Sequence, residues 1–234
     1  MKVLIIIPIY NEAENITHVL DEIKEKCPDY DVLVIDDGSI DNSHKICRAR
    51  NREMVVKLPA NLGIGGARQT GFKYAVYNNY DIVVQLDGDG QHRPECMHRM
   101  IEAVVSGNNI CVGSRFITRE GFQSSALRRL GISILYWLIR ILTGENITDP
   151  TSGYRVCDKK ATRLFAWEYP HDYPEPGSIV TANKYGLKMC EVPVTMSERM
   201  SGNSSIGKKA SVMYMIKVIT AILITAIAKG TKKD

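Results

Sequence analysis

Short apolar runs separated by amphipathic stretches dominate the first half of the chain. Runs rich in Val and Ile occur at Val3–Ile7, Asp31–Ile35, Glu53–Leu58, Val83–Leu86 and Asn109–Gly113. Continuous runs of this kind are typical of strands that are covered on both faces of a parallel sheet. We therefore predict five strands in this half, with the first one ending at Pro8.

The stretches between these runs have the periodicity of helices. The segment at roughly 13–26 places Ile16, Val19, Leu20 and Ile23 on one face. Asp41 is positioned to cap a helix after the second strand. Further helices are expected through about Val76 and over about 94–105. Strands that alternate with helices at this spacing form βαβ units, so we predict an α/β fold with a mostly parallel sheet.

The second half of the chain is more apolar and less regular. Residues 126–142 predict a strongly apolar helix with arginines at 128, 129 and 140, and we interpret it as a core helix whose arginines reach the surface. A loop over Thr148–Arg155, a short helix and the proline-rich stretch Tyr169–Gly177 follow. A last strand is expected near Leu187–Val192.

The segment Ala210–Ala228 predicts a helix about 28 Å long at roughly 1.5 Å per residue, just enough to cross a bilayer. Lys217 interrupts it, however. One stripe of the helix carries small or polar residues, namely Ser211, Tyr214, Lys217, Ala221, Thr225 and Ala228. This pattern favours an interfacial helix, or one docked on a membrane partner, over a spanning helix or a soluble core helix.

Composition narrows the possible partners. The 234 residues fit one large α/β domain or a domain with an appendage, and a formal net charge of +4 is too small to indicate nucleic-acid binding. The positive charge is uneven, because seven Lys and Arg but a single acid lie between Arg199 and Asp234. Phosphates or an anionic membrane surface would explain this excess.

The cysteines and the first residues bear on the compartment. The six cysteines show neither CxxC spacing nor pairing with histidine, so we interpret them as buried thiols in a reducing compartment. The apolar start is short and lacks the length and cleavage site of a signal peptide. We therefore expect a cytoplasmic protein.

Asp87, Asp89 and Gln91 follow the fourth predicted strand. Alternate side chains of an extended or turning backbone point the same way, so the three can converge. Gly88 and Gly90 allow a sharp turn. Three oxygen ligands at a strand end suit Mg²⁺ or Mn²⁺ bound together with substrate phosphates. The alternative is a solvated Asp-Gly turn.

Polar residues also follow other predicted strands. They are Tyr10 and Glu12, Asp36 and Asp37, and Arg115. In parallel sheets, ligands bind outside the carboxyl ends of the strands. The glycine loop at 63–66 departs from the dinucleotide-binding pattern GxGxxG, so we interpret it as a phosphate- or nucleotide-lining loop before a helix.

These residues together form a recognisable pattern. It consists of Pro8-Ile9-Tyr10-Asn11-Glu12, Asp36-Asp37-Gly38-Ser39, Asn61-Leu62-Gly63, Asp87-Gly88-Asp89 with Gln91-His92, Gly113-Ser114-Arg115, Thr151-Ser152-Gly153-Tyr154-Arg155, and Glu198-Arg199 followed by Gly202. In these motifs the chain resembles the inverting glycosyltransferases of family 2, which have a GT-A fold. It is most similar to the polyprenyl-phosphate hexose synthases, the dolichol-phosphate mannose synthase group. It lacks the two clear transmembrane helices of the larger members.

The resemblance implies a role for each matching position. The residues that would bind the nucleotide-sugar are Pro8, Tyr10, Glu12, Asp37 and Asp87. Asp87, Asp89 and Gln91 would surround the metal and the donor diphosphate. Arg115, Arg128 and Arg199 would hold the acceptor phosphate, with Arg129 as a substitute for Arg128. Glu175 is interpreted as a sugar contact, with a general base or a plain loop residue as alternatives.

The implied activity is the transfer of a hexose from a nucleotide-sugar to polyprenyl (undecaprenyl) phosphate at the cytoplasmic face of the membrane, for cell-surface glycan assembly. UDP-glucose or UDP-N-acetylglucosamine is the first expectation for the donor. A phosphate acceptor is already ionised and needs cations, whereas a sugar hydroxyl needs a general base. Transfer to a hydroxyl of a growing polysaccharide, and a non-catalytic nucleotide-binding subunit, remain as alternatives.

The resemblance also implies how the chain is divided. Residues 1–200 would form the GT-A catalytic domain, with the nucleotide-sugar and metal half at 1–115 and the acceptor half at 116–200. Residues 201–234 would form an acceptor-phosphate loop and an amphipathic, membrane-associated helix. A small membrane-protein subunit or a second copy of the chain is a possible partner of that helix.

Overall fold

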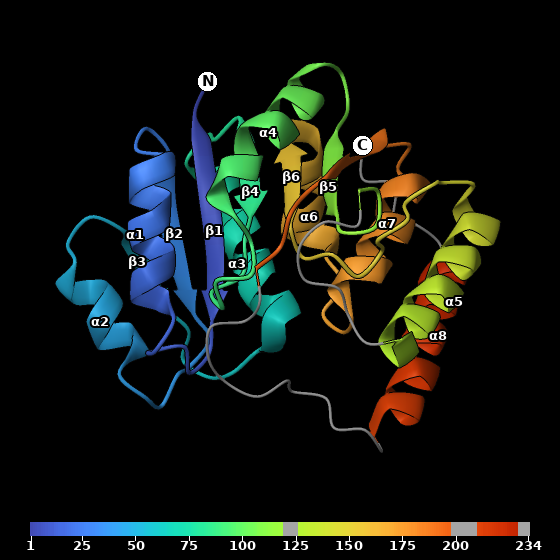
Figure 1. Ribbon diagram of the computed structural model, residues 1–234, viewed down its shortest axis with the longest axis horizontal. Coiled ribbons are helices and arrows are strands. Elements are labelled where there is room, and N and C mark those ends of the chain that lie inside the picture. The colour runs from blue at the N-terminus through green and yellow to red at the C-terminus, as the bar shows by residue number, and fades with distance from the viewer. Residues whose placement is uncertain (119–125, 198–209, 229–234) are drawn as a thin grey trace.

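A seven-stranded sheet with the order β3-β2-β1-β4-β6-β5-β7 forms the centre of the computed structural model, which describes residues 1–118, 126–197 and 210–228 (Figure 1). The strands are β1 (Val3–Ile9), β2 (Asp31–Asp36), β3 (Met54–Lys57), β4 (Ile82–Gln85), β5 (Ile110–Ser114), β6 (Arg155–Asp158) and β7 (Met189–Pro193). Strand β6 runs antiparallel to β4 and β5, and the other neighbouring strands are parallel. The prediction of an α/β fold with a mostly parallel sheet is confirmed.

Helices cover both faces of the sheet (Figure 1). They are α1 (Ile16–Lys26), α2 (Ser43–Ala49), α3 (Gly63–Tyr77), α4 (Met97–Val105, after a 3₁₀ turn at Pro94–Cys96), α5 (Ala126–Thr143), α6 (Lys159–Glu168), α7 (Pro174–Lys184) and α8 (Ala210–Ile227). Strand β1 contributes Leu4 and Ile6 to one buried cluster and Ile5 and Ile7 to the other. Two-sided burial is therefore the reason why its sequence is continuously apolar.

Strand β1 continues through Pro8 to Ile9, so the prediction that proline ends this strand was wrong. The pairing between β1 and β4 stops at Ile6 and Gln85, two residues before the proline. On the other side, Pro8 lies opposite Ile35 of β2. The missing N–H of Pro8 is tolerated because no β4 residue is paired there.

The sequence pattern did not predict two of the elements, strand β6 and helix α7. Strand β6 begins at Arg155, whose buried guanidinium donates to the carbonyls of Ser152 (3.0 Å) and Glu175 (2.7 Å) and to the Ser178 hydroxyl. Helix α7 begins at Pro174, inside the proline-rich stretch. Proline fits the first helical position because the N–H that it lacks has no partner in the helix.

Helices α5 and α8 lie side by side at one edge of the molecule (Figure 1). The interpretation of α5 as a core helix is right for one face only. Ile132, Leu135 and Ile139 are buried, but the opposite face exposes Leu130, Ile134, Trp137 and Ile141. Helix α8 buries Val218 and Ile222, and Lys184 at the end of α7 donates to two carbonyls at its last turn. In the described ranges, no helix combines the length and hydrophobicity needed to cross a bilayer.

Helix α3 passes close to the backbone at 170–171, and this contact provides a test of the fold. A methyl group added at Gly65 would lie 2.6 Å from the carbonyl oxygen of Pro170 and closer still to that of His171. We expect Gly65→Ala to lower the free energy of unfolding by about 1–3 kcal/mol in urea titrations, because backbone atoms yield poorly to overpacking.

Gly131→Ala in α5 is the matched control. The nearest atom to its added methyl group is the Met215 sulfur at 3.3 Å, which belongs to a flexible side chain. Alanine gains about 1 kcal/mol of helix propensity over glycine, so this variant should be neutral or slightly more stable. Equal effects of the two substitutions would contradict the close approach at Gly65.

Candidate active site

A cleft of about 390 Å³ opens at the carboxyl ends of β1, β2 and β4. All of the residues predicted to bind the nucleotide-sugar line it, namely Pro8, Tyr10, Glu12, Asp37, Asp87 and Glu175, and Asp89 lines it as well. They come from four separate parts of the chain. The parallel arrangement of β1, β2 and β4 therefore brings these polar strand ends together.

The loops after β1 and β2 are bonded to each other at one end of the cleft. The N–H groups of Asn11, Glu12 and Ala13 donate to the side chains of Ser39 (3.0 Å), Ser43 (2.9 Å) and Asp41 (3.1 Å). Asp41 also accepts the N–H of Ser43 at 2.9 Å, but the N-cap residue of α2 is Asn42, so the prediction that Asp41 caps this helix was wrong by one residue. These bonds hold Tyr10 and Glu12 at the cleft without a ligand.

Asp37 lies at the same end of the cleft. Its carboxylate accepts the N–H of Leu62 at 2.7 Å, and burial raises the pKa of Asp37 above its usual value. Gly38 adopts a φ of +78°, and a methyl group there would lie 3.0 Å from the backbone nitrogen of Asn61. The Asp-Gly pair thus lets β2 turn tightly against the loop before α3.

Asp87 and Asp89 lie together in the cleft, whereas Gln91 does not line it. The side-chain nitrogen Nε2 of Gln91 is 3.5 Å from the Ser197 carbonyl oxygen. The backbone N–H of Gln91 donates to Asp89 Oδ1 at 3.1 Å. The structure therefore brings together two of the three predicted metal ligands. The backbone turns at Gly90 with a φ of +77°, and the regular alternation assumed for an extended chain ends there.

Two carboxylates are still a suitable protein contribution to a metal site in a nucleotide-binding cleft. Over the residues that the structure describes, no cluster of three or more His, Cys, Asp or Glu side chains is placed to hold a metal ion. Mg²⁺ and Mn²⁺ in such sites take one or two carboxylates and complete their coordination with substrate phosphates and water. Asp87 and Asp89 fit this donor set.

His92 supports the loop that carries Asp87, a role that its place in the sequence did not reveal. Its ring is buried and stacks on Tyr154, with 4.8 Å between the ring centroids. Nδ1 accepts the N–H of Asp87 at 3.1 Å. Burial lowers the pKa of His92 even though Asp87 and Asp89 oppose this effect. Because Nδ1 accepts this hydrogen bond, the buried ring fixes the start of the turn through its unprotonated nitrogen.

Arg68, on α3, was also not predicted as a site residue. Its side chain is buried, Nη2 donates to Asp87 Oδ1 at 2.8 Å, and Nη1 donates to Glu175 Oε1. Burial by itself would lower the pKa of Arg68, but Glu175 and Asp87 raise it well above its usual value. A methyl group at Gly153 would lie 2.7 Å from Nη2 and 2.8 Å from Asp87 Oδ2, so a side chain there would displace the Arg68–Asp87 pair.

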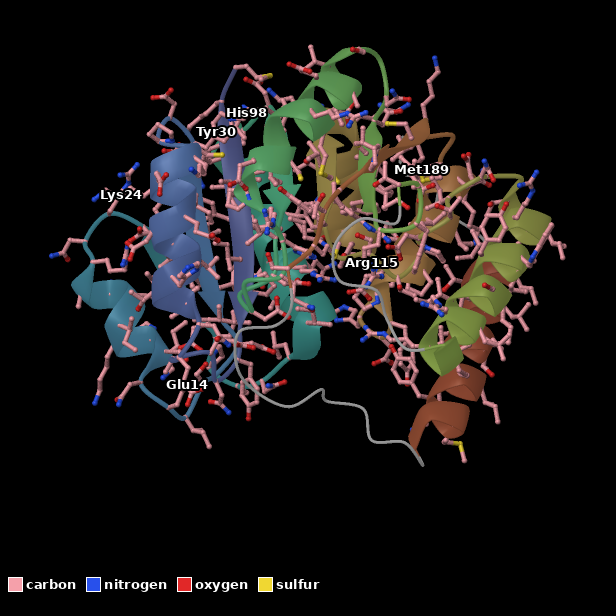
Figure 2. The ribbon with its side chains drawn as sticks, in the orientation of Figure 1. Glu14, Lys24, Tyr30, His98, Arg115 and Met189 are labelled. Carbon is pink, nitrogen blue, oxygen red and sulfur yellow. The ribbon has the colours of Figure 1, made fainter. Side chains whose placement is uncertain are left out.

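Arg115, at the end of β5, lies outside the cleft lining and on the side of the molecule that faces α5 (Figure 2). Nε and Nη2 donate to the two carboxylate oxygens of Asp149 at 2.6 and 2.7 Å, and Nη2 also donates to Thr151. Asp149 is held in turn by Glu191 of β7, which accepts its N–H at 2.9 Å. Burial raises the pKa of Glu191. The sequence did not predict this chain of carboxylates.

Of the other two predicted acceptor residues, Arg128 and Arg199, one lies among the described residues. Arg128 lies in the first turn of α5 with an exposed side chain, and partial desolvation and the positive charge of Arg115 lower its pKa. Arg115 and Arg128 are thus two cations within electrostatic reach of each other. Arg199 lies outside the described residues.

Comparisons with known proteins place this site in a family. Residues 4–165 match the family model described as Glycosyl transferase family 2. The chain is 34% identical over 212 residues to the undecaprenyl-phosphate mannosyltransferase of Micrococcus luteus, an alignment that covers 87% of each protein. It is 29% identical to the UDP-N-acetylglucosamine–dolichyl-phosphate N-acetylglucosaminyltransferase of Methanococcus voltae, over 97% of each.

A solved structure shares the fold. Glucosyl-3-phosphoglycerate synthase from Mycobacterium tuberculosis, solved in complex with Mn²⁺ and UDP-glucose, matches 98% of this chain and 80% of its own with a TM-score of 0.70. The two are 19% identical, so this likeness speaks for the fold alone. The family model covers more than two thirds of the chain and includes the strands that build the cleft. The chain therefore belongs to glycosyl transferase family 2 and is a glycosyltransferase.

Proposed function

We propose that the chain transfers a hexose from a nucleotide-sugar to a polyprenyl phosphate, with inversion at the anomeric carbon. The observation that carries this proposal is the arrangement of charges around one cleft. The carboxylates of Asp87 and Asp89 lie inside the cleft. Arg115 lies on the side that faces α5, and Arg128 belongs to α5 itself. The relatives from Micrococcus luteus and Methanococcus voltae are named as lipid-phosphate sugar transferases, which supports the same acceptor class here.

Asp87 and Asp89 would hold the divalent cation at the donor diphosphate. When bound, Mg²⁺ or Mn²⁺ acts as a Lewis acid that stabilises the charge on the departing nucleoside diphosphate. Asp37 and Tyr10 would bind the nucleoside at the other end of the cleft, where the bonded loops keep their positions. The Mycobacterium tuberculosis synthase, which has the same fold, is described in complex with Mn²⁺ and UDP-glucose, so Mn²⁺ and a UDP-sugar are the ligands to test first.

The acceptor would approach from the α5 side. A phosphate monoester is ionised at neutral pH and needs cations to position it, which arginines at 115, 128 and 199 would provide. The forked hydrogen bonds from Arg115 to Asp149 fix the plane of the guanidinium. We therefore propose that Arg115 orients the acceptor phosphate as well as compensating its charge. Gln91 would act as a metal ligand only after its side chain turns from Ser197.

Glu175 fits a sugar contact better than a general base. Its carboxylate lines the cleft, but one oxygen, Oε1, already accepts a charged hydrogen bond from the buried Arg68 side chain, which holds the carboxylate in place. Transfer to a sugar hydroxyl would need a base. This pairing therefore favours a phosphate acceptor over the alternative, a hydroxyl of a growing polysaccharide.

The donor is proposed more broadly than the acceptor. The two relatives are named for mannose and for N-acetylglucosamine, so the family does not fix the sugar. We propose UDP-glucose or UDP-N-acetylglucosamine as the donors to test first. The division into a donor half (1–115), an acceptor half (116–200) and a membrane-associated end (201–234) goes with this proposal.

The exposed apolar faces of α5 and α8 supply a way to meet a lipid substrate. Trp137 and Ile141 of α5 are 58% and 78% exposed, and Ile224 and Ile227 of α8 are 63% and 82% exposed. Lysines flank α8 in the sequence at positions 208, 209, 229, 232 and 233. We propose that this paired face lies on the cytoplasmic leaflet, where basic residues favour anionic lipid. A small membrane subunit or a second copy is the alternative occupant.

Removal of the metal, or of one of its proposed ligands, should stop transfer. Asp89→Asn keeps an oxygen that accepts the Gln91 N–H but removes the charge. We expect a loss of activity on the order of a hundredfold or more, because a bound divalent cation contributes several kcal/mol to the transition state. EDTA should give the same loss, reversed by Mn²⁺ or Mg²⁺. Full activity in EDTA, with unfolding unchanged, would disprove the metal assignment.

Arg128 and Arg129 form a matched pair for the acceptor site, because both are exposed and neighbours in α5. Arg128→Ala should lower kcat/KM for undecaprenyl phosphate about tenfold or more, since a charged hydrogen bond is worth about 1.5–3 kcal/mol. The affinity for UDP, measured by calorimetry, should stay the same. Arg129→Ala should have little effect, and the reverse result would move the role to Arg129. Arg199→Ala is expected to behave like Arg128→Ala.

The membrane face is tested by charge substitutions at exposed apolar positions. Ile141→Glu and Trp137→Glu should reduce flotation with anionic vesicles, because each places a carboxylate in the proposed lipid contact. Val105→Glu on α4 is the control, since Val105 is 62% exposed but lies on a different helix. If all three variants float like the native protein, α5 does not face the membrane.

A further inference from the structure

Arg68 is buried beneath the carboxylates to which it donates. Its side chain is 1% exposed, whereas those of Asp87 and Glu175 are 32% and 20% exposed. The two carboxylates come from different parts of the chain, Asp87 from the loop after β4 and Glu175 from the first turn of α7. The buried guanidinium of Arg68 therefore links the loop after β4 to the first turn of α7 beneath the cleft.

The burial of Arg68 is energetically unfavourable in itself. Nε of Arg68 is buried and makes no hydrogen bond, although a buried donor normally has a partner. A methyl group at Gly153 would come within 3 Å of both Arg68 and Asp87, so this glycine leaves room for the pair. The guanidinium stays charged at every accessible pH. These features indicate that a permanent positive charge is required at this place.

The charges in this end of the cleft leave room for a divalent cation. Asp87, Asp89 and Glu175 bring three negative charges and Arg68 brings one positive charge, so two negative charges remain. Without Arg68, three carboxylates would repel one another in a partly buried site. The Nη2 bond to Asp87 Oδ1 also fixes the rotation of that carboxylate.

We propose that Arg68 is a positioning residue that sets both the charge and the geometry of the metal site. It compensates Asp87 and Glu175, limits the affinity for the divalent cation, and holds the proposed metal ligand and the proposed sugar contact at a fixed separation. This inference rests on the proposed function, because it takes the cation to bind at Asp87 and Asp89. The positive charge of Arg68 weakens the binding of the divalent cation, whereas its hydrogen bond to Asp87 holds that carboxylate in a fixed orientation.

The test measures Mn²⁺ binding by electron paramagnetic resonance, with no nucleotide present, and turnover separately. Arg68→Met should bind Mn²⁺ roughly tenfold more tightly, because a nearby positive charge is removed, yet turn over more slowly. Arg68→Lys retains the charge but pairs with one carboxylate, so it should bind Mn²⁺ like the native protein and still turn over more slowly. Opposite changes in metal affinity and kcat are not expected from a loss of packing.

Arg155→Met is the matched control, since Arg155 is also buried but donates to carbonyls and a hydroxyl. It should lower stability without tighter Mn²⁺ binding. Equal or weaker Mn²⁺ binding by Arg68→Met, or tighter binding by Arg155→Met as well, would overturn the role of Arg68. So would a loss of UDP affinity in EDTA for Arg68→Met, which would indicate direct contact with the diphosphate. Absence of Mn²⁺ binding to the native protein both without nucleotide and with UDP present would overturn the metal assignment itself.

Discussion

Burial of both faces of the central sheet is the constraint on which the site depends. Ile5 and Ile7 point into one apolar layer and Leu4 and Ile6 into the other, so β1 is buried on both faces in the middle of the sheet. The neighbouring strands β2 and β4 run parallel to it. Their polar ends therefore meet at one edge, where Tyr10, Asp37 and Asp87 line one cleft. A slip of one residue along β1 would exchange its side chains between the two apolar layers and move Tyr10 out of line with Asp37 and Asp87, so the packing of the core and the alignment of the site are linked.

Strand β6 brings a further segment of the chain to the edge of the sheet where the cleft lies. It enters between β4 and β5 in the antiparallel direction, so the segment Thr151–Tyr154 arrives at the same edge as the parallel strand ends. Gly153 reaches the Arg68–Asp87 pair from this segment, and Thr151 reaches Arg115. One reversed strand thus connects the side of the cleft that holds Asp87 with the side that holds Arg115.

Helices α7 and α8 connect the cleft with the apolar edge of the molecule. Tyr173, just before α7, packs edge-to-face on Tyr214 of α8 with 4.9 Å between ring centroids. Two residues later, Glu175 joins Arg68 at the cleft. Under the proposed function, this continuity would keep the cleft at a defined height above the exposed apolar face of α5 and α8. The same helices would be poorly placed for this if α5 were buried on all sides.

The sequence alone determined the α/β class, most of the strands, the family, and the polar strand ends that form the cleft. These are local or periodic properties, since a Val/Ile run or an Asp-Gly-Asp turn is visible without its neighbours in space. The sequence did not determine β6, the helix that starts at Pro174, or the pairing of Arg68 with Asp87 and Glu175, or of Arg115 with Asp149. Those partners are between 19 and 107 residues apart, and only the folded chain decides which charges meet. Burial then makes such pairs obligatory, because an arginine that leaves water must find its carboxylates or carbonyls in the fold.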